Sequence, residues 1–226
     1  YIYASQKKLS KIGIQMTYVT PEPETVNRFL EEYTFERIEE WFNKLITGFK
    51  KWTDYTFDER HKRTESIREL KFPYEYREGQ KNLCVSVYRA IEDSENLYIQ
   101  APTGVGKTLS TVFPAVQALG QQMADKIFYL TSKTITRTVA EDTYAILRDN
   151  GLHMRTVTLT AKDKICPLDE RNCNPVACPY AKGHFDRIND AVYDIITSQM
   201  VIGRDNVMEY ANRHNVCPFE MSLDVS

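Results

Sequence analysis

The sequence predicts an α/β fold in which a parallel sheet is followed by a mostly helical segment with four cysteines. Two observations carry this prediction. Segments rich in β-forming residues alternate with amphipathic helical segments between residues 76 and 160, and such alternation is typical of a parallel sheet covered by helices. A glycine-containing loop, APTGVGKT at residues 101–108, joins one of these strands to the helix that follows it.

The first part of the chain has a different pattern. We expect a short helix at the start, a strand at residues 14–20 and a turn at residues 21–24, where PEPE places two prolines. From residue 34, apolar side chains recur every three or four positions, which predicts one long helix with a stripe that packs in a core. The stripe consists of Phe35, Ile38, Phe42, Leu45, Phe49 and Trp52. The sequence therefore predicts two segments here, an N-terminal one at residues 1–30 and a long helical connector at residues 31–71.

The α/β part is expected at residues 72–161. Its predicted helices lie at residues 76–93, 107–119 and 134–149, and its predicted strands at residues 96–102, 126–132 and 154–160. After residue 161 we expect no further strands, but a mostly helical lobe at residues 162–220 and the start of a return to the α/β domain at residues 221–226. A buried helical stripe is predicted in the lobe at Ile188, Val192, Ile195 and Ile196.

Composition limits the class of protein. The 226 residues are 42% hydrophobic and 27% charged, which is typical of a globular chain. The formal net charge of −2 excludes a globally basic nucleic-acid binder, but not a local basic groove. No apolar run reaches the roughly 20 residues that a membrane helix needs. The five cysteines are an odd number and nothing indicates export, so we expect a reducing cytoplasmic location without a disulfide framework.

The loop at residues 101–108 fits the pattern G-x-x-x-x-G-K-[ST], with alanine in place of the first glycine. In this pattern, backbone N–H groups of the loop and the N-terminus of the next helix surround a phosphate. Lys107 is expected to reach the β- and γ-phosphates of ATP, and Thr108 to bind Mg²⁺, which makes them the predicted catalytic residues. The predicted ATP-binding set is Arg77, Gln80, Ala101, Pro102, Thr103, Gly104, Val105, Gly106, Lys107 and Thr108.

Two flanking motifs narrow the class of nucleotide-binding protein. FPYEYREGQ at residues 72–80 ends in Gln80, whose amide offers the donors and the acceptor that suit the edge of adenine. The alternative for Gln80 is an ordinary surface position on a helix. YLTSKTITRT at residues 129–138 combines hydroxyl groups with cations at a strand end, which suits a phosphate backbone. The alternative there is a helix N-cap at Thr131 or Ser132.

Four of the five cysteines lie in the predicted lobe, at Cys166, Cys173, Cys178 and Cys217. Gaps of 6, 4 and 38 residues separate them, whereas structural zinc sites favour closely spaced pairs. An iron–sulfur cluster tolerates wider spacing, and unliganded thiols are a third reading. His184 and His214 lie nearby and zinc could recruit them, although lone histidines are more often packing residues. Cys84 stands apart, and we expect it to be a buried apolar residue.

In combination, FPY-YR-GQ, APTGVGKT, LTSKT and the cysteine segment ending in CPF resemble the DinG/XPD-type DNA helicases of superfamily 2. The similarity covers residues 72–226. It implies a partial RecA-like phosphate-loop domain with an inserted iron–sulfur lobe. It also implies an enzyme that uses ATP and Mg²⁺ to unwind DNA, usually 5′ to 3′, in repair or related processing.

The resemblance also assigns residues to roles. Gln80 and Arg77 match an adenine-sensing motif. The residues matched to DNA contact are Thr131, Ser132, Lys133 and Thr134, and those matched to [4Fe–4S] ligands are Cys166, Cys173, Cys178 and Cys217. We expect such a cluster to pin a lobe that has too little core to fold alone. The expected partner is single-stranded or forked DNA at the nucleoid, and nothing indicates an obligate oligomer.

The sequence also departs from that family. Its acidic box, D-E-A-H or similar, does not appear, nor do the motifs of a second motor domain. Because that box holds Mg²⁺ and activates water, we expect a longer protein to be active and these residues alone to lack ATP turnover. The first residue is Tyr1 and an apolar pattern runs up to Ser226, so we expect an N-terminal fragment of a helicase.

The N-terminal segment carries a second resemblance. YIYASQKKL followed by GIQMTYV is similar to the tail of a PD-(D/E)XK, Cas4-like nuclease domain, and no nuclease residue is assigned. An alternative for the whole chain comes from another class of protein. It is a phosphate-loop nucleotide-binding module whose lobe holds a structural zinc and acts in protein interaction.

Overall fold

The computed structural model describes residues 1–102, 104–132 and 134–226 of the chain. Compactness divides it into two units, Tyr1–Asp58 and Glu59–Ser226. The division falls inside one long helix, α2 (Phe35–Glu69), which contributes to both units. The domain limits expected from the sequence stay a prediction. Within the described ranges, no helix combines the length and the apolar character that crossing a bilayer requires.

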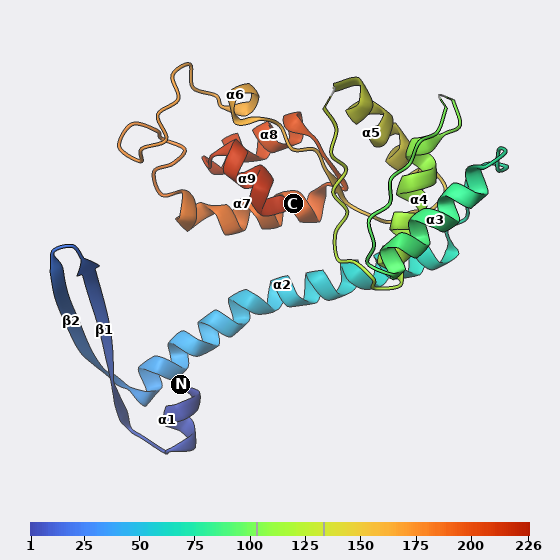
Figure 1. Cartoon of the computed structure of the whole chain (residues 1–226). Helices are drawn as coiled ribbons and strands as arrows, with labels where there is room; N and C mark the ends of the chain where they lie inside the picture. The colour runs from blue at the N-terminus through green and yellow to red at the C-terminus, as the bar shows by residue number, and fades with distance from the viewer. Residues whose placement is uncertain (103, 133) are drawn as a thin grey trace. The chain divides into compact units, whose positions relative to one another are not determined.

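The first unit consists of a short helix, a β-hairpin and the first part of α2 (Figure 1). The elements before α2 are α1 (Ile2–Gln6), β1 (Lys11–Pro21) and β2 (Glu24–Thr34). The two strands pair antiparallel, with Met16 opposite Phe29 and Val19 opposite Val26. The predicted strand at residues 14–20 and the turn after it are confirmed, and so is the long helix.

The apolar stripe of α2 is only partly buried in the first unit. Ile38 is buried, and the ring of Tyr1 stacks on Phe35 and Phe42 with centroids 5.5 and 4.5 Å apart. Leu45 and Phe49, by contrast, are 50% and 63% exposed. The prediction that the whole stripe packs in a core is therefore wrong. The physical reason is that the aromatic cover from Tyr1 reaches only the first two turns of the helix.

The second unit begins with the last turns of α2 and contains the remaining elements (Figure 1). They are α3 (Gln80–Glu92), α4 (Lys107–Gly120), α5 (Thr134–Asp149), β3 (Thr156–Val157), α6 (Lys162–Ile165), α7 (His184–Ser198), β4 (Val201–Ile202), α8 (Arg204–His214) and α9 (Pro218–Val225). The predicted helices at 107–119 and 134–149 are confirmed. The helix predicted at 76–93 begins only at Gln80, because Gly79 precedes it with a left-handed φ of 73°.

The predicted three-stranded parallel sheet is replaced by a shorter one. β3 and β4 pair in parallel over two residues each, with Thr156 opposite Val201. Strand β4 also contradicts the expectation that strands end after residue 161. The predicted strands at 96–102 and 126–132 are irregular. A strand is stable only when a neighbour completes its ladder of hydrogen bonds, and no other described segment pairs with these two.

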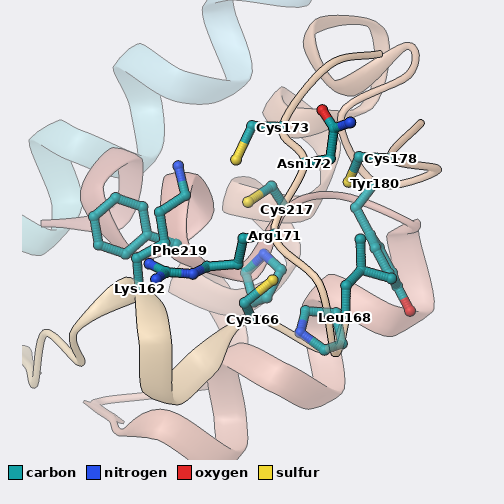
Figure 2. Close-up of a pocket in the computed structure, with 12 residues that line it drawn as sticks. Lys162, Cys166, Leu168, Arg171, Asn172, Cys173, Cys178, Tyr180, Cys217 and Phe219 are labelled. Carbon is teal, nitrogen blue, oxygen red and sulfur yellow. The ribbon is translucent and has the colours of Figure 1, made fainter. Parts of the chain in front are cut away.

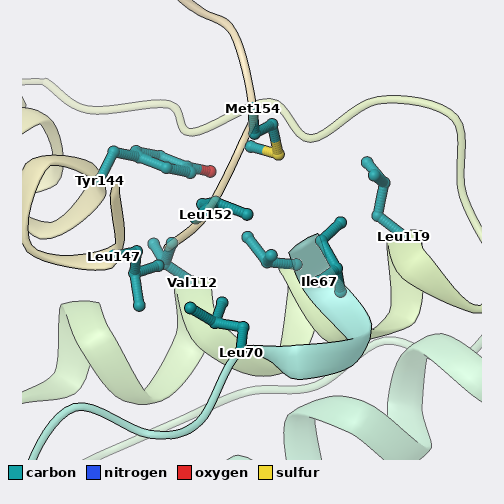
Figure 3. Close-up of a cluster of buried hydrophobic side chains, with 9 residues drawn as sticks. Ile67, Leu70, Val112, Leu119, Tyr144, Leu147, Leu152 and Met154 are labelled. Atoms are coloured by element: carbon teal, nitrogen blue, oxygen red, sulfur yellow. The ribbon is translucent and has the colours of Figure 1, made fainter. Parts of the chain in front are cut away.

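The hydrophobic core of the second unit lies between the end of α2, helices α4 and α5, and the segment that leads to β3 (Figure 3). Its buried members are Ile67, Leu70, Val112, Val116, Leu119, Tyr144, Leu147, Leu152 and Met154. Ile67 is 1% exposed and packs so closely on Gly120 that a Cβ there would lie 2.4 Å from its Cγ2 atom. Gln117 donates to the Ile67 and Leu70 carbonyls at 3.3 and 3.1 Å. These contacts make the last turns of α2 part of the core.

A polar network around Glu59 adds a second attachment for α2. One carboxylate oxygen of Glu59 lies 3.1 Å from His153 Nε2 and 3.7 Å from a guanidinium nitrogen of Arg155. Arg155 in turn donates to the carbonyl of Ile196, near the end of α7, at 2.7 Å. Burial by itself would raise the pKa of Glu59, but hydrogen bonds from His153 and Lys62 outweigh it and lower that pKa. The network therefore links α2 to the segment before β3 and to the lobe.

The lobe has a hydrophobic core of its own. Ile195, Val207, Val216 and Met221, from α7 to α9, are each 0% exposed. In the predicted stripe, Ile188, Val192 and Ile195 are buried, while Ile196 is half-buried. The expectation that the lobe has too little core is therefore wrong for its helices. It holds only for residues 166–183, which form turns without helix or strand.

We expect Ile67→Ala to lower the free energy of unfolding of the second unit by about 2–5 kcal/mol, because it removes buried methyl groups and leaves a cavity. The matched control is Ile46→Ala on the same helix, where the side chain is 48% exposed. It should change stability by less than about 0.5 kcal/mol. Urea denaturation followed by fluorescence measures both, and equal losses would contradict the packing described for Ile67.

The Glu59 network predicts a pH dependence of stability. The folded pKa of Glu59 lies below its unfolded value, so its contribution is present above the unfolded pKa and is lost as the pH falls through the folded pKa. Acidification from about pH 6 to about pH 3 should thus destabilise the wild type more than Glu59→Gln. Urea midpoints across that range provide the measurement. Glu78→Gln, at an exposed residue, serves as the control and should behave as the wild type.

Candidate phosphate loop and cysteine pocket

The loop before α4 has the backbone shape that phosphate binding requires. Gly104 and Gly106 take left-handed φ values of 86° and 76°, which side chains with a Cβ rarely adopt. Gly106 is also the N-cap of α4, so the free N–H groups of the first helical turn face the loop. An anion placed there would meet both these donors and the positive end of the helix dipole. Thr103 lies outside the described residues.

Lys107 lies folded over this loop. Its ammonium group donates to the carbonyl oxygens of Ala101 and Pro102 at 2.9 and 2.7 Å, and the described structure gives it no carboxylate partner. Thr108 follows it in the first turn of α4, and its carbonyl accepts a hydrogen bond from Thr111 at 3.0 Å. The two predicted catalytic residues therefore sit side by side at the helix N-terminus, where a phosphate would compete with carbonyl oxygens for Lys107.

Gln80 and Arg77 lie against the same loop. Gln80 is 6% exposed, so the alternative reading of a surface helix residue is wrong. Its Oε1 atom accepts the Arg77 backbone N–H at 3.0 Å, and a Cβ on Gly106 would lie 2.7 Å from its Nε2 atom. The Arg77 guanidinium donates to the Gly104 carbonyl. Both residues that the adenine motif contributes thus contact the phosphate loop directly.

The residues matched to DNA contact lie at the start of α5. Thr131 and Ser132 are exposed, and the hydroxyl groups of Thr131 and Thr136 are hydrogen-bonded. Thr134 begins the helix. Lys133 lies outside the described residues. The exposed hydroxyl groups are compatible with contact to a phosphate backbone. They are equally compatible with the alternative of a helix N-cap.

All four lobe cysteines line one small cavity of about 20 Å³ (Figure 2). Cys178 is buried, Cys166 and Cys217 are half-buried, and Cys173 is exposed. The thiols approach this cavity from the loop after α6, from the turn before α7 and from the N-cap of α9. Sequence positions up to 51 residues apart, from Cys166 to Cys217, are therefore brought together, while Cys84 is buried elsewhere, as predicted.

Cations share the cavity with these thiols. Lys162 donates to Glu220 at 3.2 Å and lies 5.0 Å over the Phe219 ring. The hydrogen bond to Glu220, and after it one to the Cys173 thiol, raise the pKa of Lys162. Burial raises the pKa of the Cys217 thiol. Arg171 also lines the cavity and is paired with Asp163.

The four thiols are the kind of ligand that a thiolate-bound metal takes. In the described structure, however, their sulfur atoms lie too far apart to hold one metal ion together. Four thiols around one cavity are what a cluster or a zinc ion takes from a protein. Nowhere among the residues described do three Cys, His, Asp or Glu side chains approach closely enough to hold a metal ion. His184 is buried and uses Nδ1 to accept a backbone N–H, whereas His214 is paired with Asp194.

Contrary to the expectation from the sequence, one stretch does match the D-E-x-H pattern of the acidic box. Residues 58–61 read D-E-R-H, but they lie within α2 and upstream of the loop. The Glu59 carboxylate is occupied by His153 and Lys62. Two turns further along α2, Ile67 packs on the last residue of α4, about 20 Å from the first residue by helix geometry. This stretch therefore has a structural role.

Comparison with known proteins finds a similarity to helicases in this part of the chain. Residues 78–172 match the family model described as DEAD/DEAH box helicase. The match supports a RecA-like phosphate-loop fold, a helicase-type function that depends on ATP, and the use of ATP and Mg²⁺. It extends from the turn before Gln80 across the loop, α5 and Cys166 to the residue before Cys173.

A curated relative agrees with this class. A segment of 47 residues is 49% identical to a probable ATP-dependent helicase of Methanocaldococcus jannaschii. The alignment covers 20% of this chain and 7% of that protein, so the chain corresponds to a small part of the relative. No solved structure matches the chain.

We expect Lys107→Ala to weaken the binding of MgATP at least about tenfold, because a charge-assisted hydrogen bond to phosphate contributes about 1.5–3 kcal/mol. Lys126→Ala, at an exposed lysine in the segment between α4 and α5, is the matched control and should bind as the wild type. Calorimetric titration measures both affinities. Equal affinity of the two variants would show that Lys107 does not contact the phosphates.

Proposed function

We propose that this chain is part of an ATP-dependent DNA helicase of the DinG/XPD type, which moves 5′ to 3′ on single-stranded or forked DNA in repair or related processing. The observation that carries the proposal is one combination in the second unit. A phosphate loop contacted by Gln80 and Arg77 occurs together with a lobe in which four cysteines face one cavity. Neither feature alone distinguishes this type from other helicases.

The residues of the motor part take the following roles in this proposal. Lys107 leaves the Ala101 and Pro102 carbonyls and neutralises the β- and γ-phosphates, while Thr108 contributes a hydroxyl to Mg²⁺. Gln80 reads the adenine edge and transmits its presence to Gly106, which it touches. The exposed Thr131 and Ser132, with Lys133 and Thr134, contact the DNA backbone, and activity takes place at the nucleoid.

The lobe holds a [4Fe–4S] cluster in this proposal, with Cys166, Cys173, Cys178 and Cys217 as ligands. The cluster would supply a rigid cross-link between segments that the fold brings together, since four thiolates bind it at once. Support comes from the shared cavity, which all four cysteines line. The exposed Cys173, on a loop without helix or strand, is the ligand with most freedom to adjust.

A structural zinc in an interaction module is the second candidate. The observation that favours it is the gap of four residues between Cys173 and Cys178, which falls within the spacing of a zinc knuckle, while both cysteines line the cavity. A zinc lobe would make the chain a nucleotide-binding protein that recruits partners without unwinding DNA. The likeness of the first unit to the tail of a Cas4-like nuclease is a separate proposal and is independent of this choice.

Metal content separates the two candidates. We expect the anaerobically purified chain to be brown and to contain about four irons and four sulfides per chain. Cys173→Ser should lose most of this iron. Cys84→Ser, at a buried cysteine outside the cavity, is the control and should keep it. One zinc per chain in a colourless protein would support the second candidate instead.

Nucleotide and DNA assays test the motor function. We expect these 226 residues to bind MgATP and single-stranded DNA but to show no DNA-stimulated ATP turnover above buffer, since no D-E-x-H box follows the loop. Lys133→Ala should reduce the slope of log affinity against log salt by about one, whereas Lys126→Ala should not change it. Turnover by the isolated chain would contradict the role assigned to the acidic box.

A further inference from the structure

Two lobe cysteines that are far apart in the sequence are joined by side-chain contacts from one helix. Cys178 ends the cysteine-rich loop, and Cys217 follows it after the excursion through α7, β4 and α8. Both are adjacent to the first turn of α7, which begins at His184. The side chains of His184 and Arg187 from this turn reach the backbone on both sides.

His184 fixes the backbone of Cys217. It is 5% exposed, and its Nδ1 atom accepts the backbone N–H of Cys217 at 3.2 Å. Cys217 is the N-cap of α9, and its carbonyl accepts the N–H of Met221 at 2.9 Å. A buried N–H without a partner is costly, so the imidazole keeps this N-cap in one place.

Arg187, three residues after His184 in the first turn of α7, makes the second link. Its Nη2 atom donates to the carbonyls of Lys182 and Asn215, both at 2.7 Å, and its Nε atom donates to the carbonyl of His214 at 3.1 Å. Lys182 belongs to the turn that begins at Cys178, since its N–H donates to the Cys178 carbonyl at 3.1 Å. One guanidinium group thus joins the Cys178 turn to the residues just before Cys217.

The other half of the pocket is held less firmly. Cys173 is exposed and lies in a loop without helix or strand. Its neighbour Arg171 pairs with Asp163, and both of these side chains are at least half exposed. Exposed ion pairs contribute little to stability, so they order the loop weakly. The pocket therefore combines two cysteines whose backbone is held by side chains of α7, Cys178 and Cys217, with one on a weakly ordered loop, Cys173.

We propose that His184 and Arg187 are positioning residues that hold Cys178 and Cys217 in place before any metal binds, so that the loop with Cys173 closes last. The proposal rests on the cysteine pocket of the proposed function, but it describes the metal-free protein. It assigns His184 to holding a ligand backbone, in contrast to the reading in which it serves zinc directly.

The test measures thiol reactivity at each cysteine in the metal-free chain. After removal of metal with a chelator, iodoacetamide is added and labelling is followed by peptide mass spectrometry. In the wild type, Cys173 should react much faster than Cys178 and Cys217. His184→Leu should speed labelling of Cys217 about five- to tenfold, the effect of losing one hydrogen bond on local opening, and leave Cys173 unchanged.

Matched variants separate positioning from general stability. His184→Asn keeps an acceptor near the place of Nδ1 and should restore slow labelling of Cys217. Arg187→Ala should expose both Cys178 and Cys217. His214→Leu removes the side-chain pair with Asp194 but keeps the backbone carbonyl to which Arg187 donates, and labelling of Cys217 should stay slow in this variant. Circular dichroism checks that each variant is folded.

The outcomes are decisive in both directions. The proposal is overturned if Cys217 in the wild type reacts as fast as Cys173, if His184→Leu changes nothing, or if His214→Leu has the same effect as His184→Leu. Because no metal is present, a chain that binds no iron would refute the proposed function and leave this result standing. A chain that binds iron but lacks the expected labelling pattern would refute the positioning role of His184 and Arg187 and leave the proposed function standing.

Discussion

The burial of Ile67 against the end of α4 is the contact on which the second unit depends. It places the last turns of α2 inside the core that α4 and α5 share with the segment before β3. Because α4 carries the phosphate loop at its other end, the same packing determines where Lys107 lies. Gly120 permits this approach, since any larger residue would meet Ile67. The end of α2, which the sequence predicts to be a connector, thus packs on the helix that carries the candidate nucleotide site.

Polar contacts extend this arrangement to the lobe. Arg155 joins Glu59 on α2 to a carbonyl at the end of α7, and Arg187 joins both sides of the first turn of the same helix. Guanidinium groups suit this task because their planar donors can reach several carbonyl oxygens at once. Helix α7 is therefore held at both ends, and together with the pairing of β3 and β4 it attaches the cysteine pocket to the α/β part.

The phosphate loop and the cysteine pocket differ in how completely the fold forms them. The phosphate loop has its backbone shape and the Gln80 contact in place, and the family match over residues 78–172 agrees with it. In the cysteine pocket, the thiols converge without forming a metal-binding set among the described residues. Half of that pocket is fixed by His184 and Arg187, whereas the loop with Cys173 is exposed. This difference between the two halves is the basis for the proposal that the loop with Cys173 closes last.

The sequence by itself determined the local features of this protein. The helices at 107–119 and 134–149 followed from periodicity, and the phosphate loop from its glycines and lysine, because these depend on neighbouring residues. It could not determine contacts between distant segments. The β-forming residues at 96–102 and 126–132 looked like strands, but a strand needs a partner that periodicity does not specify. Likewise, only the tertiary structure placed Gln80 on Gly106, Ile67 on Gly120 and His184 on Cys217, since each of these contacts joins residues that folding alone brings together.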